Sequence, residues 1–238
     1  MNSPFARSAS PLRAGAEPTD EAGRELRSGA SRLDASGQVA KRTIDFSLAL
    51  VALFALAPLM LIICLAIRYS DRGPAIFRQT RVGRGGRRFT CFKFRSMVLD
   101  TEEALRRHLE ADPEAEREWR ESQKLRSDPR VTRMGLFLRR SSLDELPQIF
   151  NILSGDMSFV GPRPIVPSEC ARYGKHLSDY MSVRPGLTGP WQIGGRSDCS
   201  YAERVRLDAE YARNWRVATD IAIIVKTVPI VLSQRGSC

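Results

Sequence analysis

The 238-residue sequence has few of the residues that build metal sites and disulfide frameworks. It holds two histidines and five cysteines, and no two cysteines form a Cys-x-x-Cys pair. The histidines lie far apart in the chain, without a partner at helical spacing. These absences argue against a zinc site and a disulfide scaffold, so we expect reduced thiols.

The sequence also lacks the signatures of nucleic-acid-binding modules. It has no zinc-finger spacing, no basic zipper and no Gly-aromatic RNA-binding motif. Lys and Arg also neutralise lipid headgroups and phosphorylated substrates, so the net charge of +10 has other uses. We therefore expect no nucleic-acid partner.

A long uncharged apolar run extends from Phe46 to Ile67. As a straight helix it would be about 33 Å long, roughly the thickness of the hydrocarbon core of a bilayer. Pro58 within the run could turn the chain back, because proline bends helices. Positive charge marks the cytoplasmic side of a membrane, and here it flanks both ends: Lys41 and Arg42 before the run, and Arg68, Arg72, Arg78 and Arg81 after it. These residues alone leave a spanning helix and a re-entrant hairpin open.

The remainder of the chain predicts shorter elements. Residues 75–97 are typical of a β-hairpin around a Gly-rich turn. Residues 101–123 are dense in Glu and Arg and predict a solvated helix interrupted by a proline. Residues 201–215 predict a charged helix. The apolar stretch 220–232 is too short to span a bilayer, so we expect it in the membrane interface or against the core.

Asp144 and Glu145 stand side by side behind a pair of arginines. Ser142 and Glu145 have the spacing of a capping box, which predicts a helix with both carboxylates in its first turn. The free amides of such a turn attract anions and would keep the carboxylates ionised. One reading is therefore structural: Asp144 would favour the helix dipole, and Glu145 would close the capping box.

The other reading is chemical. Of two adjacent carboxylates, one can attack a phosphorus atom while the other holds Mg²⁺, which screens the anionic substrate. Arginine suits a diphosphate because its planar fork forms paired hydrogen bonds. The cations that could assist are Arg139 and Arg140, Arg163 in a Pro-flanked loop, and Lys93 with Arg95 on the expected hairpin.

Several motifs occur in a fixed order. They are Lys-Phe-Arg-Ser-Met (93–97), Asp-Pro-Arg-Val-Thr-Arg-Met-Gly (128–135), Leu-Arg-Arg-Ser-Ser-Leu-Asp-Glu-Leu-Pro-Gln (138–148), Asn151 to Asp156, Gly-Pro-Arg-Pro (161–164) and Arg-Pro-Gly-Leu-Thr-Gly (184–189). Together they strongly resemble the bacterial sugar transferase family, the monotopic polyprenyl-phosphate phosphoglycosyl transferases. The resemblance extends from about residue 41 to the C-terminus.

The resemblance implies an enzyme at the cytoplasmic face of the bacterial inner membrane. It would transfer a sugar 1-phosphate, with galactose or glucose as the sugar, from a UDP-sugar to undecaprenyl phosphate and release UMP. This is the first membrane step of exopolysaccharide synthesis. The expected partners are the UDP-sugar, undecaprenyl phosphate and inner-membrane lipid; a homo-oligomer stays open.

The same resemblance implies an α+β, mainly helical fold. We expect a disordered tail over residues 1–40, because their composition shows no apolar periodicity. A re-entrant membrane helix over residues 41–72 would be broken at a proline. A small cytoplasmic-face catalytic domain over residues 73–238 would contain a β-hairpin and amphipathic interfacial helices.

Residue roles follow from the matching motif positions. The resemblance implies that Asp144 is the nucleophile, that Glu145 is the Mg²⁺ ligand, and that the phosphates and nucleotide meet Lys93, Arg139 and Arg163. The membrane segment has its own set: Lys41, Arg42, Asp45 and Pro58. We expect Lys41 and Arg42 to attract anionic lipid headgroups. Many family members have Ser before the proline of the break, whereas this chain has Ala57.

Two rival functions remain. A non-catalytic, membrane-anchored adaptor of a polysaccharide assembly complex would explain the apolar run and the basic charge. It gives no reason for adjacent carboxylates among so many arginines suited to phosphate. A metal-dependent phosphatase or nucleotidyl transferase at the membrane is the other enzymatic alternative.

Overall fold

The structure is a computed structural model that describes residues 35–122, 125, 127–194 and 199–232. Ser31–Cys238 form one compact unit, and the other unit, Met1–Ala30, lies outside the described residues. Most of the predicted tail therefore falls outside the description. Residues 35–40, which we had placed in that tail, are helical.

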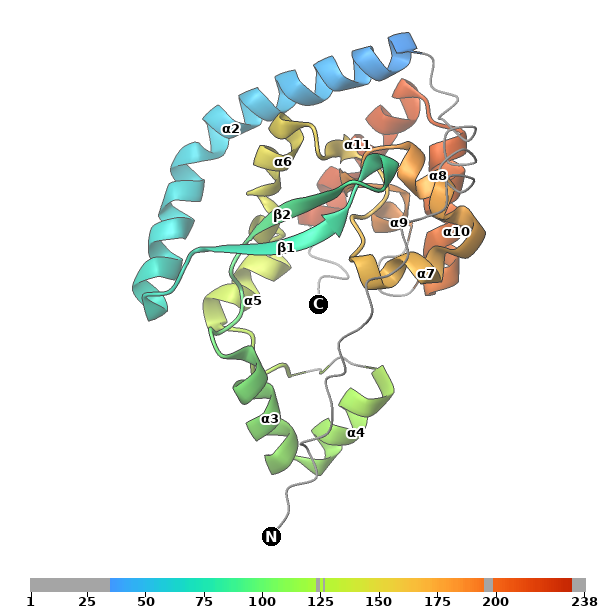
Figure 1. Cartoon of the computed structure of the whole chain (residues 1–238). Helices are drawn as coiled ribbons and strands as arrows, with labels where there is room; N and C mark the ends of the chain where they lie inside the picture. Colours follow the sequence, from blue (N-terminus) through green and yellow to red (C-terminus); the bar gives the residue numbers. More distant parts are fainter. Residues whose placement is uncertain (1–34, 123–124, 126, 195–198, 233–238) are drawn as a thin grey trace. The chain divides into compact units, whose positions relative to one another are not determined.

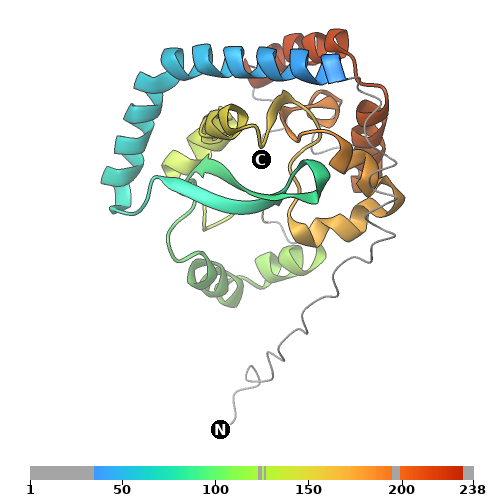
Figure 2. The ribbon, with the colours of Figure 1, turned by 45° about the horizontal axis from the view of Figure 1, so that its top comes forward.

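The apolar run lies in α2, a single helix from Ala35 to Asp71 (Figure 1). Within the described part of the chain, it is the one helix long and apolar enough to cross a membrane. Figure 2 shows α2 bent into two arms, and Pro58 lies inside the helix. Proline removes a backbone donor and clashes with the preceding turn, which bends a helix without ending it. α2 is bent but continuous, so the predicted break does not interrupt the helix, and its re-entrant course in a membrane stays a prediction.

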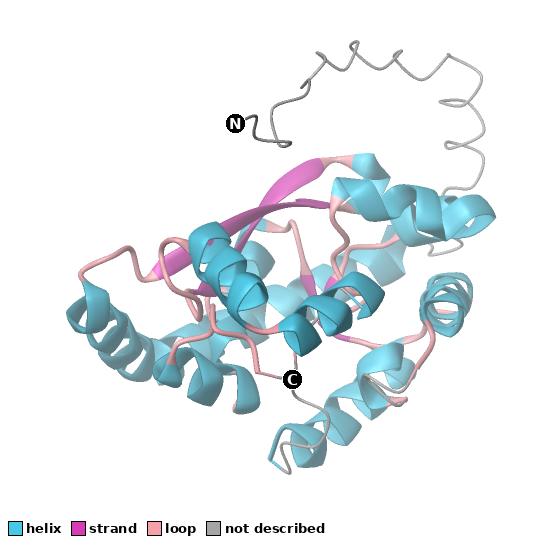
Figure 3. Ribbon diagram, turned by 90° about the horizontal axis from the view of Figure 1, so that it is seen from below, coloured by secondary structure: helices cyan, strands magenta, loops and turns pink. Residues whose placement is uncertain are grey.

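The predicted hairpin forms from β1 (Ile76–Val82) and β2 (Arg88–Phe94), which pair antiparallel with Gln79 opposite Cys91. A 3₁₀ turn, η1 (Arg84–Gly86), joins them, and Gly85 has a φ of 66°, in the region that glycine adopts without strain. Two further strands, β3 (Ser158–Val160) and β4 (Gly186–Thr188), pair in parallel. Figure 3 shows how small the share of strand is beside the helices.

Helices make up most of the described chain. The charged segment breaks at its proline as predicted, into α3 (Thr101–Ala111) and α4 (Pro113–Ser122). The others are α5 (Arg133–Arg140), α6 (Gln148–Ser154), α7 (Cys170–Tyr173), α8 (Leu177–Ser182), α9 (Pro190–Ile193), α10 (Tyr201–Arg213) and α11 (Val217–Leu232). Three short 3₁₀ turns complete the set: η2 (Leu143–Glu145), η3 (Pro167–Glu169) and η4 (Gly174–His176).

The core that positions the site lies where α6 packs between α2 and β2. Ile149 and Ile152 of α6 are buried against Phe89 and Cys91 of β2, and Ala49 of α2 joins the same cluster. Full burial of one isoleucine contributes about 1.5–3 kcal/mol. Apolar packing therefore fixes the α6 segment, which follows the paired carboxylates, against the strand that carries Lys93.

The polar residues at the start of α2 turn into the protein. Lys41 Nζ donates to Asp220 Oδ2 (2.5 Å) and to the carbonyl oxygen of Val160 (3.1 Å). Arg42 Nη1 and Nη2 donate to two carbonyl oxygens at the end of α6, and Asp45 Oδ1 accepts from a β3 amide. The charged ends of Lys41 and Arg42 are thus held by protein groups, and their attraction of lipid headgroups stays a prediction.

α11 has two unlike faces. Asp220 and Ile223 are buried, whereas Ile221, Val225 and Val228 are each more than half exposed. The helix packs against α9, β3 and β4. The stretch was predicted to lie either against the core or in the membrane interface. One face of α11 does pack against the protein; the placement of the exposed face in a membrane stays a prediction.

Candidate active site

The paired carboxylates lie on a tight turn between α5 and α6. α5 ends at Arg140, Ser142 has a left-handed φ of 57°, and the 3₁₀ turn η2 carries Asp144 and Glu145. Left-handed backbone is uncommon for serine and marks a locally over-determined position. The turn directs Asp144 inward, where 9% of its surface is exposed.

The predicted capping box is wrong. The Ser142 side chain makes no cap hydrogen bond, because its left-handed backbone differs from the extended geometry of an N-cap. Pro147 has no amide hydrogen to continue a helix from Leu143, so α6 begins only at Gln148. The carboxylates therefore precede the helix, and the structural reading of Glu145 as a cap does not hold.

Lys93 on β2 faces both carboxylates. Its Nζ lies 2.6 Å from Glu145 Oε1 and 3.9 Å from Asp144 Oδ2. The side chains of Lys93 and Glu145 stay partly open to solvent, and Asp144 is the most buried of the three. The structure thus brings together three of the predicted site residues.

Burial raises the pKa of Asp144 above its usual value, the positive charges of Lys93 and Arg139 lower it, and Glu145 raises it. The net direction is upward. The expectation that a helical turn would hold Asp144 firmly ionised is therefore not met. Its charge depends instead on the two cations beside it, since burial disfavours the charged form of a carboxyl.

Arg139 reaches the site from the last turn of α5. Its Nε donates to the hydroxyl of Ser96, 2.8 Å away. α5 approaches this segment closely because Gly135 has no side chain: a Cβ there would lie 1.9 Å from the Ser96 carbonyl oxygen. Thr132 caps the same helix by accepting from the amide of Gly135. The motif over residues 128–135 thus serves to place Arg139.

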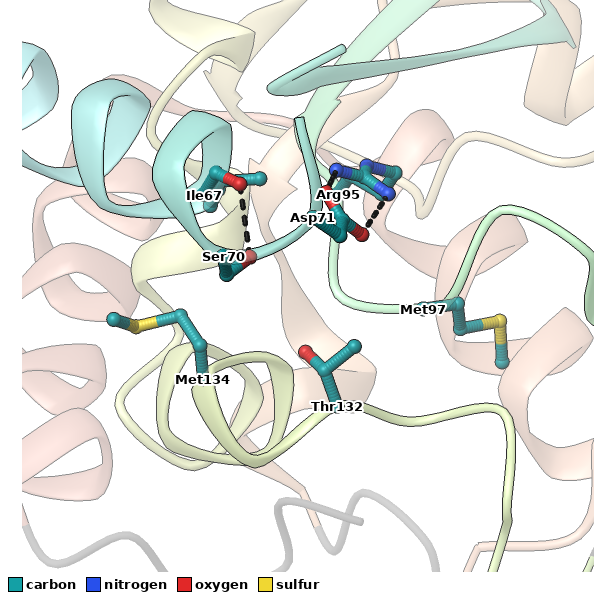
Figure 4. A pocket seen from close by; sticks show the side chains of 7 residues that line it. All are labelled: Ile67, Ser70, Asp71, Arg95, Met97, Thr132 and Met134. Carbon is teal, nitrogen blue, oxygen red and sulfur yellow. Dashed lines mark hydrogen bonds and ion pairs between the residues drawn. The ribbon is translucent and has the colours of Figure 1, made fainter. Parts of the chain in front are cut away.

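Arg95 takes a structural position. It forms an ion pair with Asp71 at the end of α2, and its Nε donates to the carbonyl oxygen of Pro74 (2.7 Å). Figure 4 shows this pair beside a shallow hollow between α2 and α5. Arg95 is buried, so it is occupied in joining α2 to the end of β2 and is not free to meet a diphosphate.

Arg163 belongs to a second group of residues. Its guanidinium lies 5.4 Å from the Trp191 ring centre, and that of Arg204 lies 5.3 Å from the same ring. Asp208 is fully buried nearby; burial raises its pKa to about 6, against the lowering effects of the Tyr173 hydroxyl and of the charges of Arg204 and Arg163. Among the described residues, four buried atoms that lack a hydrogen bond gather here: Trp191 Nε1, Arg204 Nε and Nη2, and Asp208 Oδ1. Arg204 Nε lies 3.9 Å from Asp208 Oδ2, as an ion pair.

The pKa of the Cys91 thiol responds to charges from both the carboxylate turn and the Arg163 group. Burial raises its pKa; Lys93, Arg81 and Arg163 lower it, and Glu145 raises it. Charges from the carboxylate turn and from the Arg163 loop therefore both act at this one buried point of β2.

The carboxylates of Asp144 and Glu145 could supply part of the ligands of Mg²⁺, with water and substrate phosphates as the others. Among residues 35–122, 125, 127–194 and 199–232, no cluster of three or more His, Cys, Asp or Glu could hold a metal alone. Mg²⁺ commonly uses one or two carboxylates and completes its shell with water and substrate phosphates. Asp144 and Glu145 supply two such carboxylates on one turn, and Glu145 is accessible.

Sequence reasoning missed several members of the second group. They are Trp191, Arg204 and Asp208, which stand outside the recognised motifs. Arg204 and Asp208 are four residues apart on α10, but this spacing is common on wet helix faces. α10 is covered by α8 and α9, which are separate elements of the chain, so no local signal could have revealed the burial of these two residues.

Residues 36–234 match the sequence model of the family described as bacterial sugar transferase. The chain is 46% identical over 202 residues to "Undecaprenyl-phosphate galactose phosphotransferase" of Salmonella typhimurium, covering 85% of this chain and 42% of that protein. It is 45% identical over 201 residues to "Exopolysaccharide production protein ExoY" of Sinorhizobium fredii, covering 84% and 89%.

A third relative is "UDP-glucose:undecaprenyl-phosphate glucose-1-phosphate transferase" of Xanthomonas campestris pv. campestris. It is 43% identical over 218 residues, which cover 88% of this chain and 42% of that protein. The chain thus matches less than half the length of the Salmonella and Xanthomonas relatives, and most of the length of the Sinorhizobium relative.

Proposed function

The chain belongs to the bacterial sugar transferase family, as its motifs predicted, and we propose that it transfers a sugar 1-phosphate from a UDP-sugar to undecaprenyl phosphate. The names of the relatives support this substrate pair. The observation in the structure that best supports it is the Lys93 ammonium between a buried and a partly exposed carboxylate, since phosphoryl transfer needs a nucleophile and balancing cations.

The proposed reaction has two displacements. An Asp144 carboxylate oxygen attacks the β-phosphorus of the UDP-sugar, the bond from that phosphorus to the bridging oxygen breaks, and UMP leaves. An oxygen of the lipid phosphate then attacks the phosphorus of the acyl-phosphate, and the Asp144 carboxylate is released. Each step forms one P–O bond and breaks one, so no other reactant is needed.

The cations have separate roles in this proposal. Lys93 lowers the pKa of Asp144 and so favours the ionised nucleophile. The charge of Arg139 also lowers the pKa of Asp144, and its guanidinium would meet the phosphate under attack. Arg163, which stacks on Trp191, would meet the nucleotide side of the donor. Their fixed positions favour developing charge without reorganisation of the site.

Mg²⁺ would be held by Glu145 together with the substrate phosphates. When bound, it neutralises charge on the diphosphate and so lessens its repulsion from the carboxylate nucleophile. Lys93 is the ion-pair partner of Glu145. Glu145 is partly exposed and already pairs with one cation, so it can also bind a metal ion that arrives with the UDP-sugar.

We place the site at the cytoplasmic face of the bacterial inner membrane. The exposed apolar side chains of α2 and α11 would enter the bilayer, with α2 re-entrant at its bend. The carboxylate turn would then lie at headgroup height, where a soluble donor and a lipid-tethered acceptor can both arrive. Galactose and glucose are the proposed sugars, because the names of the relatives include both.

The function is tested with the purified full chain in detergent, supplied with UDP-galactose or UDP-glucose, undecaprenyl phosphate and Mg²⁺. We expect UMP release and lipid-linked sugar phosphate, both lost when Mg²⁺ is chelated. Asp144→Asn should remove both products, because the amide cannot attack phosphorus. Glu145→Gln should keep a residual rate that needs more Mg²⁺.

The same assay separates the rival functions. An adaptor would release no UMP. A phosphatase or nucleotidyl transferase would leave no sugar phosphate on the lipid. Donor labelled in the β-phosphate should leave a hydroxylamine-sensitive label on the native protein and none on Asp144→Asn; equal labelling of both would remove Asp144 from the nucleophile role.

A further inference from the structure

Asn151 is a buried polar residue on the face of α6 that packs against β2. One per cent of its surface is exposed, and its neighbours Ile149 and Ile152 supply the apolar packing of the same helix. Asparagine is a weak helix former, and a buried amide is costly unless it is hydrogen-bonded. Its presence here needs a reason that apolar packing does not give.

Both polar atoms of the Asn151 amide are hydrogen-bonded to the backbone of β2. Its Nδ2 donates to the carbonyl oxygen of Thr90 (2.7 Å), and its Oδ1 accepts from the amide of Phe92 (3.0 Å). β1 pairs with β2 along one edge of the two-stranded sheet. On the other edge, the Asn151 side chain makes the two hydrogen bonds that a further strand would make.

These two hydrogen bonds lie next to the candidate active site. Phe92 directly precedes Lys93, whose Nζ contacts Glu145. At the other end, α6 begins three residues after Glu145. Asn151 therefore links two segments that both reach the site. The α6 segment follows Glu145, and the hydrogen bonds of Asn151 join it to β2, which carries Lys93.

The two hydrogen bonds of Asn151 fix the position of α6 along β2, which the packing of Ile149 and Ile152 alone does not. Ile149 and Ile152 would stay buried after a small slide of α6 along β2, because apolar contact has no preferred direction. Two hydrogen bonds to fixed backbone groups weaken steeply with misalignment, so they set the position of α6 along the strand. The same bonds thereby set where the stem of Lys93 starts relative to the carboxylate turn.

We propose that Asn151 is a positioning residue that fixes Lys93 Nζ between Asp144 and Glu145. The inference rests on the proposed function, because it assigns the amide to that reaction. Lys93 ends in a point charge on a flexible stem, so its placement depends on its backbone and on its partners. A catalytic group works within about 0.5 Å of its productive position.

The test is a double-mutant cycle with Asn151→Ala, Lys93→Met and both together, measured as UMP release per folded protein. Asn151→Ala should lower kcat about tenfold, since displacement of a catalytic group by about 1 Å has effects of this size or larger. In the Lys93→Met background the same substitution should add almost nothing, because residues that act as a unit are not additive.

Ser154→Ala is the matched control on α6. The Ser154 hydroxyl has two acceptors for its one hydrogen, the backbone oxygen of Asn151 (3.0 Å) and Asp156 Oδ2 (2.8 Å). Its loss therefore removes a hydrogen bond from the same helix without touching β2. We expect native kcat for this variant. The melting temperatures of all variants separate a loss of folded protein from a loss of rate.

A second variant, Asn151→Asp, keeps the shape of the side chain and the acceptor for the Phe92 amide. It sets an oxygen against the Thr90 carbonyl in place of the donor. Protonation of the introduced carboxyl restores a donor, so its kcat relative to the native protein should recover as the pH falls. A structural role alone would change the melting temperature while kcat per folded molecule stayed native.

The outcomes decide between the two roles. The proposal is overturned if folded Asn151→Ala has native kcat, or if its loss adds fully to that of Lys93→Met. It is also overturned if neither Asn151 variant folds while Lys93→Met does. Native protein that releases no UMP would reject the proposed function itself, a result distinct from all of these.

Discussion

At the scale of single residues, the candidate site depends on a balance between burial and charge. Burial disfavours the ionised form of Asp144, and Lys93 and Arg139 oppose that effect. Lys93 supplies the larger of the two opposing effects. A nucleophilic carboxylate must be ionised, so the rate should fall as the pH falls through the pKa of Asp144.

Lys93→Met should therefore move the acid limb of the pH–rate profile to higher pH. The substitution removes the main effect that lowers the pKa of Asp144, so the carboxyl gains its proton earlier as the pH falls. At neutral pH we expect a loss of about 100-fold, the size seen when one electrostatic group is removed from an active site. UMP release between pH 5 and pH 9 measures both; an acid limb in the native position would contradict the stated role of Lys93.

At the scale of elements, one buried ion pair joins the start of α2 to the start of α11. Asp220 also accepts from the Tyr211 hydroxyl (2.7 Å) and from Trp215 Nε1 (2.9 Å). Lys41 is the cation of this group, and it lies within reach of the Val160 carbonyl as well. The network fastens the apolar helix α2 to the strand β3 that leads into the Arg163 loop.

Lys41→Ala should destabilise the protein by about 3 kcal/mol, because it leaves a buried carboxylate without its cation. For a chain of this length that lowers the melting temperature by about 10 °C. Lys226→Ala is the matched control, since Lys226 is an exposed lysine on the same helix α11. Equal melting temperatures for the two variants in detergent would show that the Lys41 pair is not structural.

At the scale of the whole molecule, the exposed apolar side chains gather on helices. α2 carries most of them, and α5, α6 and α11 carry others, including Phe137, Phe150 and Val225. Such surface is costly in water, and a bilayer surface would remove that cost. α2 meets a bilayer either by spanning it or by turning back at its bend.

The re-entrant arrangement predicts that both ends of α2 lie on one side of the membrane. Val39 and Tyr69 are 66% and 83% exposed, so cysteines placed there are open to reagents. In a background without the native cysteines, Val39→Cys and Tyr69→Cys should both resist an impermeant maleimide in intact cells and react after permeabilisation. Reaction of one of them in intact cells would establish a spanning helix.

Much of the fold could be predicted because it depends on local patterns. The helix break at Pro113, the hairpin and the charged helix α10 follow from proline, glycine and periodicity in neighbouring residues. The cap predicted at Ser142 failed because Pro147 and a left-handed turn override the capping signal. Of the site, Lys93, Asp144 and Glu145 were predicted and do lie together, whereas the group around Trp191 could not be predicted.

The sequence by itself determined the family, the apolar helix with its proline and the pair of carboxylates, since each is carried by residues that are adjacent or at fixed spacing. Only the tertiary structure decided that Lys41 turns inward to Asp220, that Arg95 forms an ion pair with Asp71, and that Asn151 forms hydrogen bonds with the free edge of β2. Those partners are far apart in the chain. Their charges and hydrogen bonds are satisfied only after α2, α6 and β2 pack, and no local pattern encodes which distant group a buried polar atom will meet.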